Sequence, residues 1–119
     1  MNRRYELIIA IDFDGTIVEH AFPLIGPLRE GAKEVINKLY EDGYQIIIWT
    51  CRAGVHAAEA YNYLKQNEIN FHEFNRNFDY ETIGFMPSPK VCASIYIDDR
   101  NFGGIPSWNE IYETIKAST

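Results

Sequence analysis

The chain has 119 residues, of which 46% are hydrophobic and 24% are charged, and its formal net charge is −6. This size and composition fit one globular domain over residues 1–119 and exclude a disordered or fibrous protein. The acidic balance argues against nucleic acid as a partner, because proteins that bind the phosphate backbone present clusters of Lys and Arg.

The hydrophobic segments also bear on location. No apolar run approaches the roughly 20 residues that a membrane-spanning helix needs, and the N-terminal residues lack the pattern of a secretion signal. We therefore expect a cytoplasmic protein without membrane association. Cys51 and Cys92 lie in or beside apolar segments and lack metal-site spacing, which predicts reduced thiols in the core.

In the first half of the chain, strand and helix patterns alternate. Residues 5–11 form a continuous apolar run, which predicts a strand covered on both faces. Residues 15–27 carry Gly and Pro and predict an irregular turn with room for a small hairpin. Apolar side chains recur at helical spacing over residues 30–42, and Gly43 provides a C-terminal stop. Residues 44–49 predict a second strand.

The second half continues the alternation. Residues 55–66 predict a helix, residues 70–74 a short strand, residues 75–89 a long functional loop and residues 94–97 a fourth strand. Ser107 and Glu110 have the spacing of a capping box that starts a last helix, which Trp108 should help to seat. Together these elements predict an α/β fold: a three-layer, Rossmann-like, mainly parallel sheet with helices on both sides.

Polar side chains stand where three of these strands end. The segment Asp12–Thr16 (Asp-Phe-Asp-Gly-Thr) follows the first strand, Thr50 the second and Asp98-Asp99 the fourth, while Lys90 precedes the fourth. Because ligands of parallel sheets bind beyond the carboxyl ends of the strands, these side chains converge if the first strand neighbours the fourth. Carboxylates gathered at one edge normally require a cation, and Mg²⁺ prefers hard oxygen ligands that it shares with phosphate.

This ordered set resembles the four motifs of the haloacid-dehalogenase-like hydrolases, and the resemblance spans most of the chain. It implies a Mg²⁺-dependent phosphoric monoester hydrolase without a cap domain, in which Asp12 forms an aspartyl-phosphate. Asp14 would protonate the leaving oxygen and then activate water. Dehalogenases of this superfamily lack an acid at that position, so Asp14 favours phosphate-ester cleavage.

The resemblance also implies roles for the other motif residues. Thr50 would bind a phosphoryl oxygen, and Lys90 would offset negative charge on the nucleophile and the phosphate. Mg²⁺ would be held by Asp12, Asp98 and the backbone carbonyl of Asp14, with Asp99 ligating through water or orienting the ligand shell. Gly15 permits a tight turn whose backbone N–H groups are then free for phosphate oxygens. The expected substrate-binding residues are Phe13, Gly15, Thr50, Cys51, Arg52 and Lys90. Near the mouth of the cleft, contacting the leaving group or serving as surface or capping residues, we expect Arg52, His56, Asn75 and Arg76.

The intervals at residues 19–27 and 75–89 are too short to fold the cap domain of larger relatives. A capless member either accepts large substrates in an open cleft or uses a neighbouring subunit as a lid, and both alternatives stay open. Nothing basic or extended marks a polymer site, so we expect a small phosphorylated metabolite such as a sugar phosphate.

Other functions fit part of the pattern. A receiver-like phosphoacceptor domain has a similar sheet and acidic Mg²⁺ ligands, but receivers carry the phosphorylated Asp after strand three, where this chain has Phe74-Asn75. A non-catalytic phosphate-binding module is a further alternative, although every expected catalytic side chain is present. A two-metal nuclease is disfavoured by the acidic charge.

Overall fold

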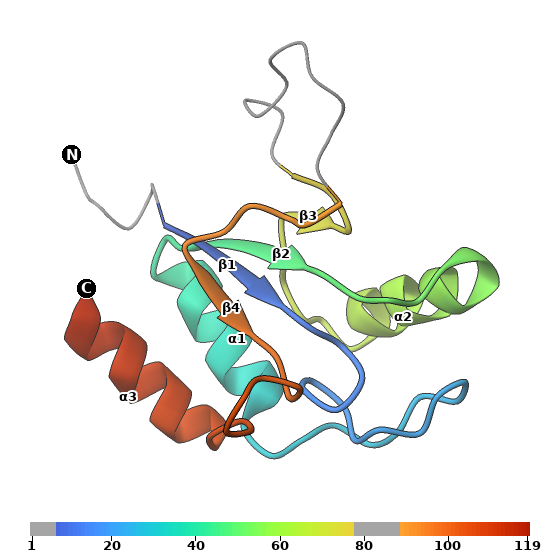
Figure 1. Cartoon of the computed structure of the whole chain (residues 1–119), viewed down its shortest axis with the longest axis horizontal. Helices are drawn as coiled ribbons and strands as arrows, with labels where there is room; N and C mark the ends of the chain where they lie inside the picture. Colours follow the sequence, from blue (N-terminus) through green and yellow to red (C-terminus); the bar gives the residue numbers. More distant parts are fainter. Residues whose placement is uncertain (1–6, 78–88) are drawn as a thin grey trace, which may run out of the picture.

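The structure is a computed structural model that describes residues 7–77 and 89–119. The described residues form, in chain order, β1 (Ile8–Ile11), α1 (Ala32–Glu41), β2 (Gln45–Ile48), α2 (Gly54–Gln66), β3 (Glu73–Phe74), β4 (Ile95–Ile97) and α3 (Trp108–Ser118). The strands build one sheet in the order β3-β2-β1-β4, and all its pairs are parallel (Figure 1). The predicted α/β fold with a Rossmann-like parallel sheet is confirmed.

The central strand β1 fixes where the polar strand ends meet. Its sequence Ile-Ile-Ala-Ile is buried throughout, as expected for a strand covered on both faces. In the register of the sheet, Ile11 lies opposite Ile48 of β2 and Ile97 of β4. The residues that follow β1, β2 and β4 therefore emerge at the same edge of the sheet.

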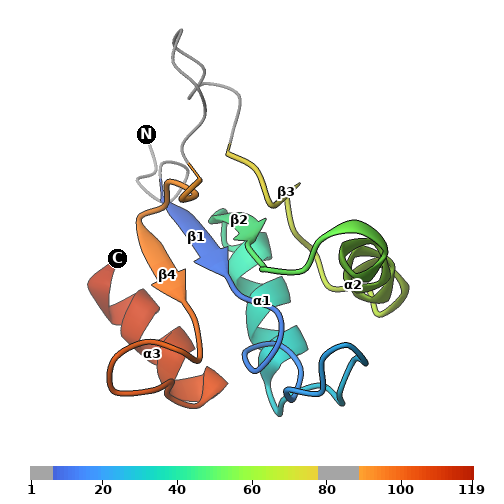
Figure 2. The ribbon, with the colours of Figure 1, turned by 45° about the vertical axis from the view of Figure 1, so that its right-hand side comes forward.

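The two faces of the sheet are covered differently. Buried residues of all three helices join one core cluster with Ile9, Ile11 and Ile48, and α1 and α3 lie next to each other on this side (Figure 2). Ile8, Ala10 and Ile47 form a second cluster with Val91. No helix of the described residues contributes to this second cluster. Among the described residues, the chain around Val91 covers this face, where the alternation of elements predicted a helix.

Local signals in the sequence account for the helix boundaries. Helix α1 ends before Gly43, whose φ of 102° is the left-handed conformation expected of a helix stop. At α3 the predicted capping box is present: the Ser107 hydroxyl accepts from the Glu110 N–H, and the Glu110 carboxylate accepts from the Ser107 N–H. The Trp108 indole N–H donates to the Thr16 carbonyl at 2.9 Å, which seats α3 on the loop after β1.

The segment between β1 and α1 makes a short antiparallel excursion, as expected from its Gly and Pro content. The Glu19 N–H donates to the Pro27 carbonyl at 2.8 Å, and the Arg29 N–H donates to the Ile17 carbonyl at 2.9 Å. Residues 19–27, which we call the 19–27 segment, thus return close to the end of β1. Its span is far too short for a cap domain.

Other expectations need correction or lie outside the described residues. Cys51 and Cys92 are free, as predicted, but both are exposed rather than in the core, because they lie beyond the buried parts of β2 and β4. Residues 78–88 of the predicted loop, and residues 5–6 of the first predicted strand, lie outside the described residues. Within the described ranges, no helix has the length and apolar content needed to cross a membrane.

His72, which lies just before β3, forms a pH-dependent contact with β2. Its Nδ1 accepts a hydrogen bond from the buried Ile46 N–H at 2.9 Å, and its ring stacks on Tyr40 with 4.5 Å between centroids. Burial lowers the pKa of His72 from 6.5, against the opposing charge of Glu73. An imidazolium has no acceptor nitrogen, so protonation breaks the bond to Ile46.

Below pH 6.5 the unfolded chain therefore binds a proton that the folded protein does not. We expect the free energy of unfolding to fall as the pH drops from 6.5 towards the lower folded pKa. His72→Phe keeps a ring on Tyr40 but leaves the Ile46 N–H without its acceptor, and should lose about 1 kcal/mol at neutral pH together with this acid dependence. Urea unfolding at several pH values measures both. The exposed His20→Phe is the control, and equal acid slopes for wild type and His72→Phe would contradict the assignment.

Candidate metal and phosphate site

Three carboxylates meet at the carboxyl edge of the sheet. Asp12 follows β1, and Asp98 and Asp99 follow β4, whose last residue Ile97 is paired with Ile11. One carboxylate oxygen from each of the three acids lies within 4.8 Å of the others. The expectation that the first and fourth strands bring these acids together is confirmed.

The proximity changes the titration of Asp12. Burial and the charge of Asp98 raise the pKa of Asp12 from 3.8 to about 7, whereas the hydrogen bond from Thr16 acts in the opposite direction. Ionised Asp12 is therefore unfavourable at neutral pH unless positive charge is nearby. A bound cation would counter both effects, since its positive charge stabilises the buried carboxylate and offsets the repulsion from Asp98.

Thr16 organises this cluster, a role that the sequence did not assign to it. Its hydroxyl is fully buried, donates to Asp12 Oδ2 at 3.1 Å and accepts from the Asp99 N–H at 2.9 Å. Its carbonyl accepts from Trp108 Nε1 and from Arg29 Nη1. The only signal in the sequence was its place in the Asp-Phe-Asp-Gly-Thr segment, where the turn carries a hydroxyl back to Asp12.

Position 15 requires glycine, because the Asp99 side chain lies too close to leave room for another side chain. The φ of Gly15 is +85°, and a Cβ at this position would lie 2.2 Å from Asp99 Oδ2. The Gly15 N–H donates to the Val18 carbonyl at 2.7 Å. The expectation that this N–H is free for a phosphate oxygen is therefore wrong for this turn, because the turn itself uses the donor.

The second acid of the segment has a different environment. Asp14 forms a two-bond ion pair with Arg52, with Nε 2.7 Å from Oδ2 and Nη2 2.8 Å from Oδ1. The Arg52 side chain is 1% exposed and the Asp14 side chain 14%. Arg52 was predicted to contact the substrate, but this burial places it behind Asp14, where it cannot do so.

Two further predicted residues are Thr50, which comes shortly after β2, and Lys90, which lies before β4. The Thr50 hydroxyl accepts from the Arg52 N–H at 3.2 Å, and the Thr50 N–H donates to Asn75 Oδ1 at 2.8 Å. Because that hydroxyl oxygen accepts, its own hydrogen can serve a further acceptor such as a phosphoryl oxygen. Lys90 is exposed, with Nζ 4.9 Å from the centroid of the Tyr96 ring.

Two further expectations concern side chains beside the motifs. The Phe13 ring is fully buried and makes an edge-to-face contact with Tyr63, with 6.0 Å between the ring centroids. Contrary to the expectation, this side chain therefore does not reach a substrate. Cys51, which is also expected to bind substrate, is exposed and follows Thr50. His56 lies at the start of α2 and pairs with Glu59 at 3.1 Å. Arg76 lies shortly after β3 and pairs with Glu73 at 3.2 Å.

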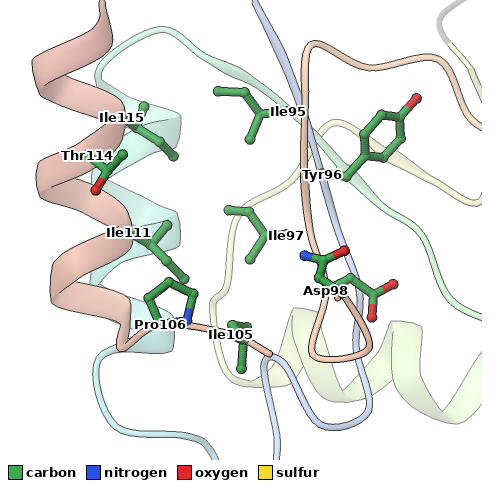
Figure 3. Close-up of a pocket in the computed structure, with 10 residues that line it drawn as sticks. Ile95, Tyr96, Ile97, Asp98, Ile105, Pro106, Ile111, Thr114 and Ile115 are labelled. Carbon is green, nitrogen blue, oxygen red and sulfur yellow. The ribbon is translucent and has the colours of Figure 1, made fainter. Parts of the chain in front are cut away.

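An apolar pocket of about 190 Å³ lies between β4 and α3. Ile95 and Ile97 point into it from β4, whereas Tyr96 and the Asp98 carboxylate point to the other side of the strand (Figure 3). Most of its lining residues are apolar, and none of them is cationic. The pocket therefore offers no positive charge to a phosphate, and the candidate site is the acidic edge to which the Asp98 carboxylate belongs.

No family model matches the chain, and no curated protein matches it. A solved structure does: the structure of a conserved protein coded by a locus from Bacteroides thetaiotaomicron is 41% identical, with a TM-score of 0.87. The alignment covers 95% of this chain and 92% of that one. The chain belongs to the same family as this Bacteroides protein. Because that relative is described only as conserved, the activity has to be argued from the site.

The steric requirement at Gly15 can be separated from its backbone strain. Gly103 has a similar φ of +93°, but a Cβ there meets nothing within 4 Å. Gly103→Ala should therefore lose only the roughly 1–2 kcal/mol of a left-handed residue. Gly15→Ala carries that strain and the clash with Asp99, so we expect a larger loss in urea unfolding and weaker binding of Mg²⁺ by calorimetry. Equal losses for the two variants would show that the approach of Asp99 to Gly15 is not constrained.

The raised pKa of Asp12 predicts a stabilising substitution. Between pH 3.8 and about 7 the folded protein holds a proton that the unfolded chain has released, so the contribution of Asp12 to stability falls as the pH rises through this range. In EDTA at alkaline pH, Asp12→Asn should therefore unfold at a higher temperature than wild type, and the difference should shrink in acid.

Adding Mg²⁺ should reverse this order, because the cation stabilises the folded wild type through Asp12. Asp42→Asn is the control, since Asp42 pairs with Lys116 at 3.2 Å and should not change the response to Mg²⁺. A wild type that is more stable than Asp12→Asn in EDTA at alkaline pH would contradict the proposed repulsion.

Proposed function

We propose that the protein is a Mg²⁺-dependent phosphatase that hydrolyses a phosphate monoester through an aspartyl-phosphate on Asp12. The observation that carries the proposal is the approach of Asp12, Asp98 and Asp99 within 4.8 Å of one another at the carboxyl edge of a parallel sheet. A further acid, Asp14, stands two residues after the proposed nucleophile. The resemblance of these motifs to those of the haloacid-dehalogenase-like hydrolases supports the same reaction.

The donor set fits Mg²⁺. Asp12 and Asp98 would hold the cation together with the backbone carbonyl of Asp14, and Asp99 would ligate through water or orient the shell. Hydrogen bonds already hold two of these acids: Asp98 Oδ1 accepts from the Arg100 N–H at 2.9 Å, and the Asp99 N–H donates to the Thr16 hydroxyl at 2.9 Å. When bound, the cation would offset the negative charge of the phosphate and the carboxylates.

In the first step, a carboxylate oxygen of Asp12 attacks phosphorus, and the bond from phosphorus to the ester oxygen breaks. The electron pair of that bond goes to the leaving oxygen, which takes a proton from Asp14. Thr16 supports the attack by holding Oδ2 of Asp12 in place at 3.1 Å. Thr50 would donate its hydroxyl hydrogen to a phosphoryl oxygen, and Lys90 would offset charge.

In the second step, water attacks the phosphorus of the aspartyl-phosphate while Asp14 takes its proton. The bond between phosphorus and the Asp12 oxygen breaks, which releases inorganic phosphate and restores the carboxylate. Asp14 can do this while paired with Arg52, because each of its oxygens uses one lone pair for the guanidinium and keeps another. Its side chain also stays partly exposed to solvent.

The proposed substrate is a small phosphorylated metabolite such as a sugar phosphate. The described residues contribute no cap, so the substrate enters an open edge or a second subunit covers it. A receiver-like phosphoacceptor gains no support, since β3 ends at Phe74, is followed by Asn75 rather than an aspartate, and lies at the edge of the sheet. A phosphate-binding module without catalysis differs from a phosphatase only in turnover.

Hydrolysis of p-nitrophenyl phosphate tests the proposal. We expect turnover with Mg²⁺, its loss in EDTA and its abolition in Asp12→Asn, while Asp14→Asn should lower kcat by about 10²–10⁴-fold as one acid–base group does. Asp42→Asn should keep the wild-type rate. Wild-type turnover by Asp12→Asn would remove Asp12 as the nucleophile, and a persistent acyl phosphate without turnover would favour the receiver-like alternative.

A further inference from the structure

We propose that Arg52 is a positioning residue, which holds the Asp14 carboxylate in the orientation for proton transfer and ties the 19–27 segment to it. This inference rests on the proposed phosphatase function. It assigns Arg52 to the acid–base step rather than to substrate binding, and it makes the arrangement around Asp14 a unit of three chain segments.

Every N–H donor of the guanidinium is used inside the protein. Nε and Nη2 each donate to one oxygen of Asp14, at 2.7 and 2.8 Å. Nη2 also donates to the Leu24 carbonyl at 2.9 Å. Nη1 donates to the carbonyls of Pro23 and His56, at 3.3 and 3.4 Å. An arginine has five N–H donors, so none is left to bind a substrate.

The surroundings of Arg52 make Asp14 its charge partner. The guanidinium carbon lies close to two aromatic rings, 5.4 Å from the centroid of Phe13 and 5.0 Å from that of Phe22. A buried charge is tolerated when it is paired and hydrogen-bonded, and is strongly unfavourable otherwise. Arg52 can therefore reach the chemistry only through Asp14.

The pair fixes the orientation of the Asp14 carboxylate. Two parallel hydrogen bonds to one guanidinium determine the plane of the carboxylate as well as its position, which a single bond or a lysine does not. Since Asp14 is 14% exposed and Arg52 1%, the guanidinium lies behind the carboxylate as seen from solvent. The remaining lone pairs of Asp14 are those available to the leaving oxygen and the water.

The same guanidinium ties the 19–27 segment to the acid. It binds the carbonyls of Pro23 and Leu24, while the side chains of Phe22 and Leu24 stay 48% and 74% exposed. A leaving group that takes its proton from Asp14 therefore departs beside this segment. Loss of Arg52 should release the orientation of Asp14 and the position of the segment together.

The dependence on the leaving group separates this role from a merely structural one. Departure of an alkoxide needs a proton, whereas p-nitrophenolate leaves without one, and kcat/KM reports the steps up to that departure. For Arg52→Gln and Arg52→Lys with Mg²⁺, we expect kcat/KM for an alkyl phosphate to fall by about 10²–10⁴-fold. For p-nitrophenyl phosphate the change should be much smaller. In an Asp14→Asn background, Arg52→Gln should add no further loss with the alkyl phosphate.

The control is Glu59→Gln, which removes the exposed ion pair with His56 at the start of α2 and touches neither Arg52 nor Asp14. The ratio of the two kcat/KM values is unaffected by the fraction of active protein. Equal losses for both substrates would overturn the proposal, and so would failure of both Arg52 variants to fold, because Arg52 would then serve stability alone. A wild type that hydrolyses neither ester would instead refute the proposed phosphatase.

Discussion

Repulsion among three carboxylates at the ends of β1 and β4 is the constraint on which the site depends. The parallel pairing of Ile11 with Ile97 brings these acids together, and the pKa of Asp12 rises to about 7 as a result of burial and the charge of Asp98. The protein opposes this repulsion with neutral donors, chiefly the Thr16 hydroxyl. Such donors hold the acids in place without removing their charge, which leaves the repulsion for a cation to relieve.

The loop after β1 separates two aspartates that stand only two residues apart. Asp12 faces the acids of β4, and Asp14 faces the guanidinium of Arg52. One carboxylate thus lies among negative charges and the other beside a positive one. Two carboxylates in contrasting environments are suited to different tasks, here the proposed nucleophile and the proposed acid–base group. The tight turn that produces this divergence requires Gly15, because any side chain would meet Asp99.

The sequence predicts the acidic edge once β1 is taken to pair with β4, because the acids are placed by local patterns. Continuous apolar runs identify β1 and β2, and the acids follow the strands directly, so a parallel sheet brings them to one edge. The role of Arg52 could not be predicted in the same way. A basic residue after a strand reads as exposed, and only the fold of the 19–27 segment, with Phe22 over the guanidinium, encloses it. Thr16 acts through contacts with Asp99 and Trp108, far along the chain, which no local pattern encodes.

The uneven covering of the two sheet faces also depends on contacts that no local sequence pattern encodes. Alternation of elements predicts helices on both faces, but the described residues before β4 form no helix, and one tyrosine helps to hold them in place. The Tyr96 hydroxyl donates to the Val91 carbonyl at 2.5 Å and accepts from the Ala93 N–H at 3.1 Å. The Tyr96 ring also lies 4.9 Å from Lys90 Nζ. Strand β4 therefore carries Asp98 at its end and helps to hold, through Tyr96, the segment that bears Lys90. A single strand thus positions one acid of the proposed site and contacts the lysine proposed to offset charge there.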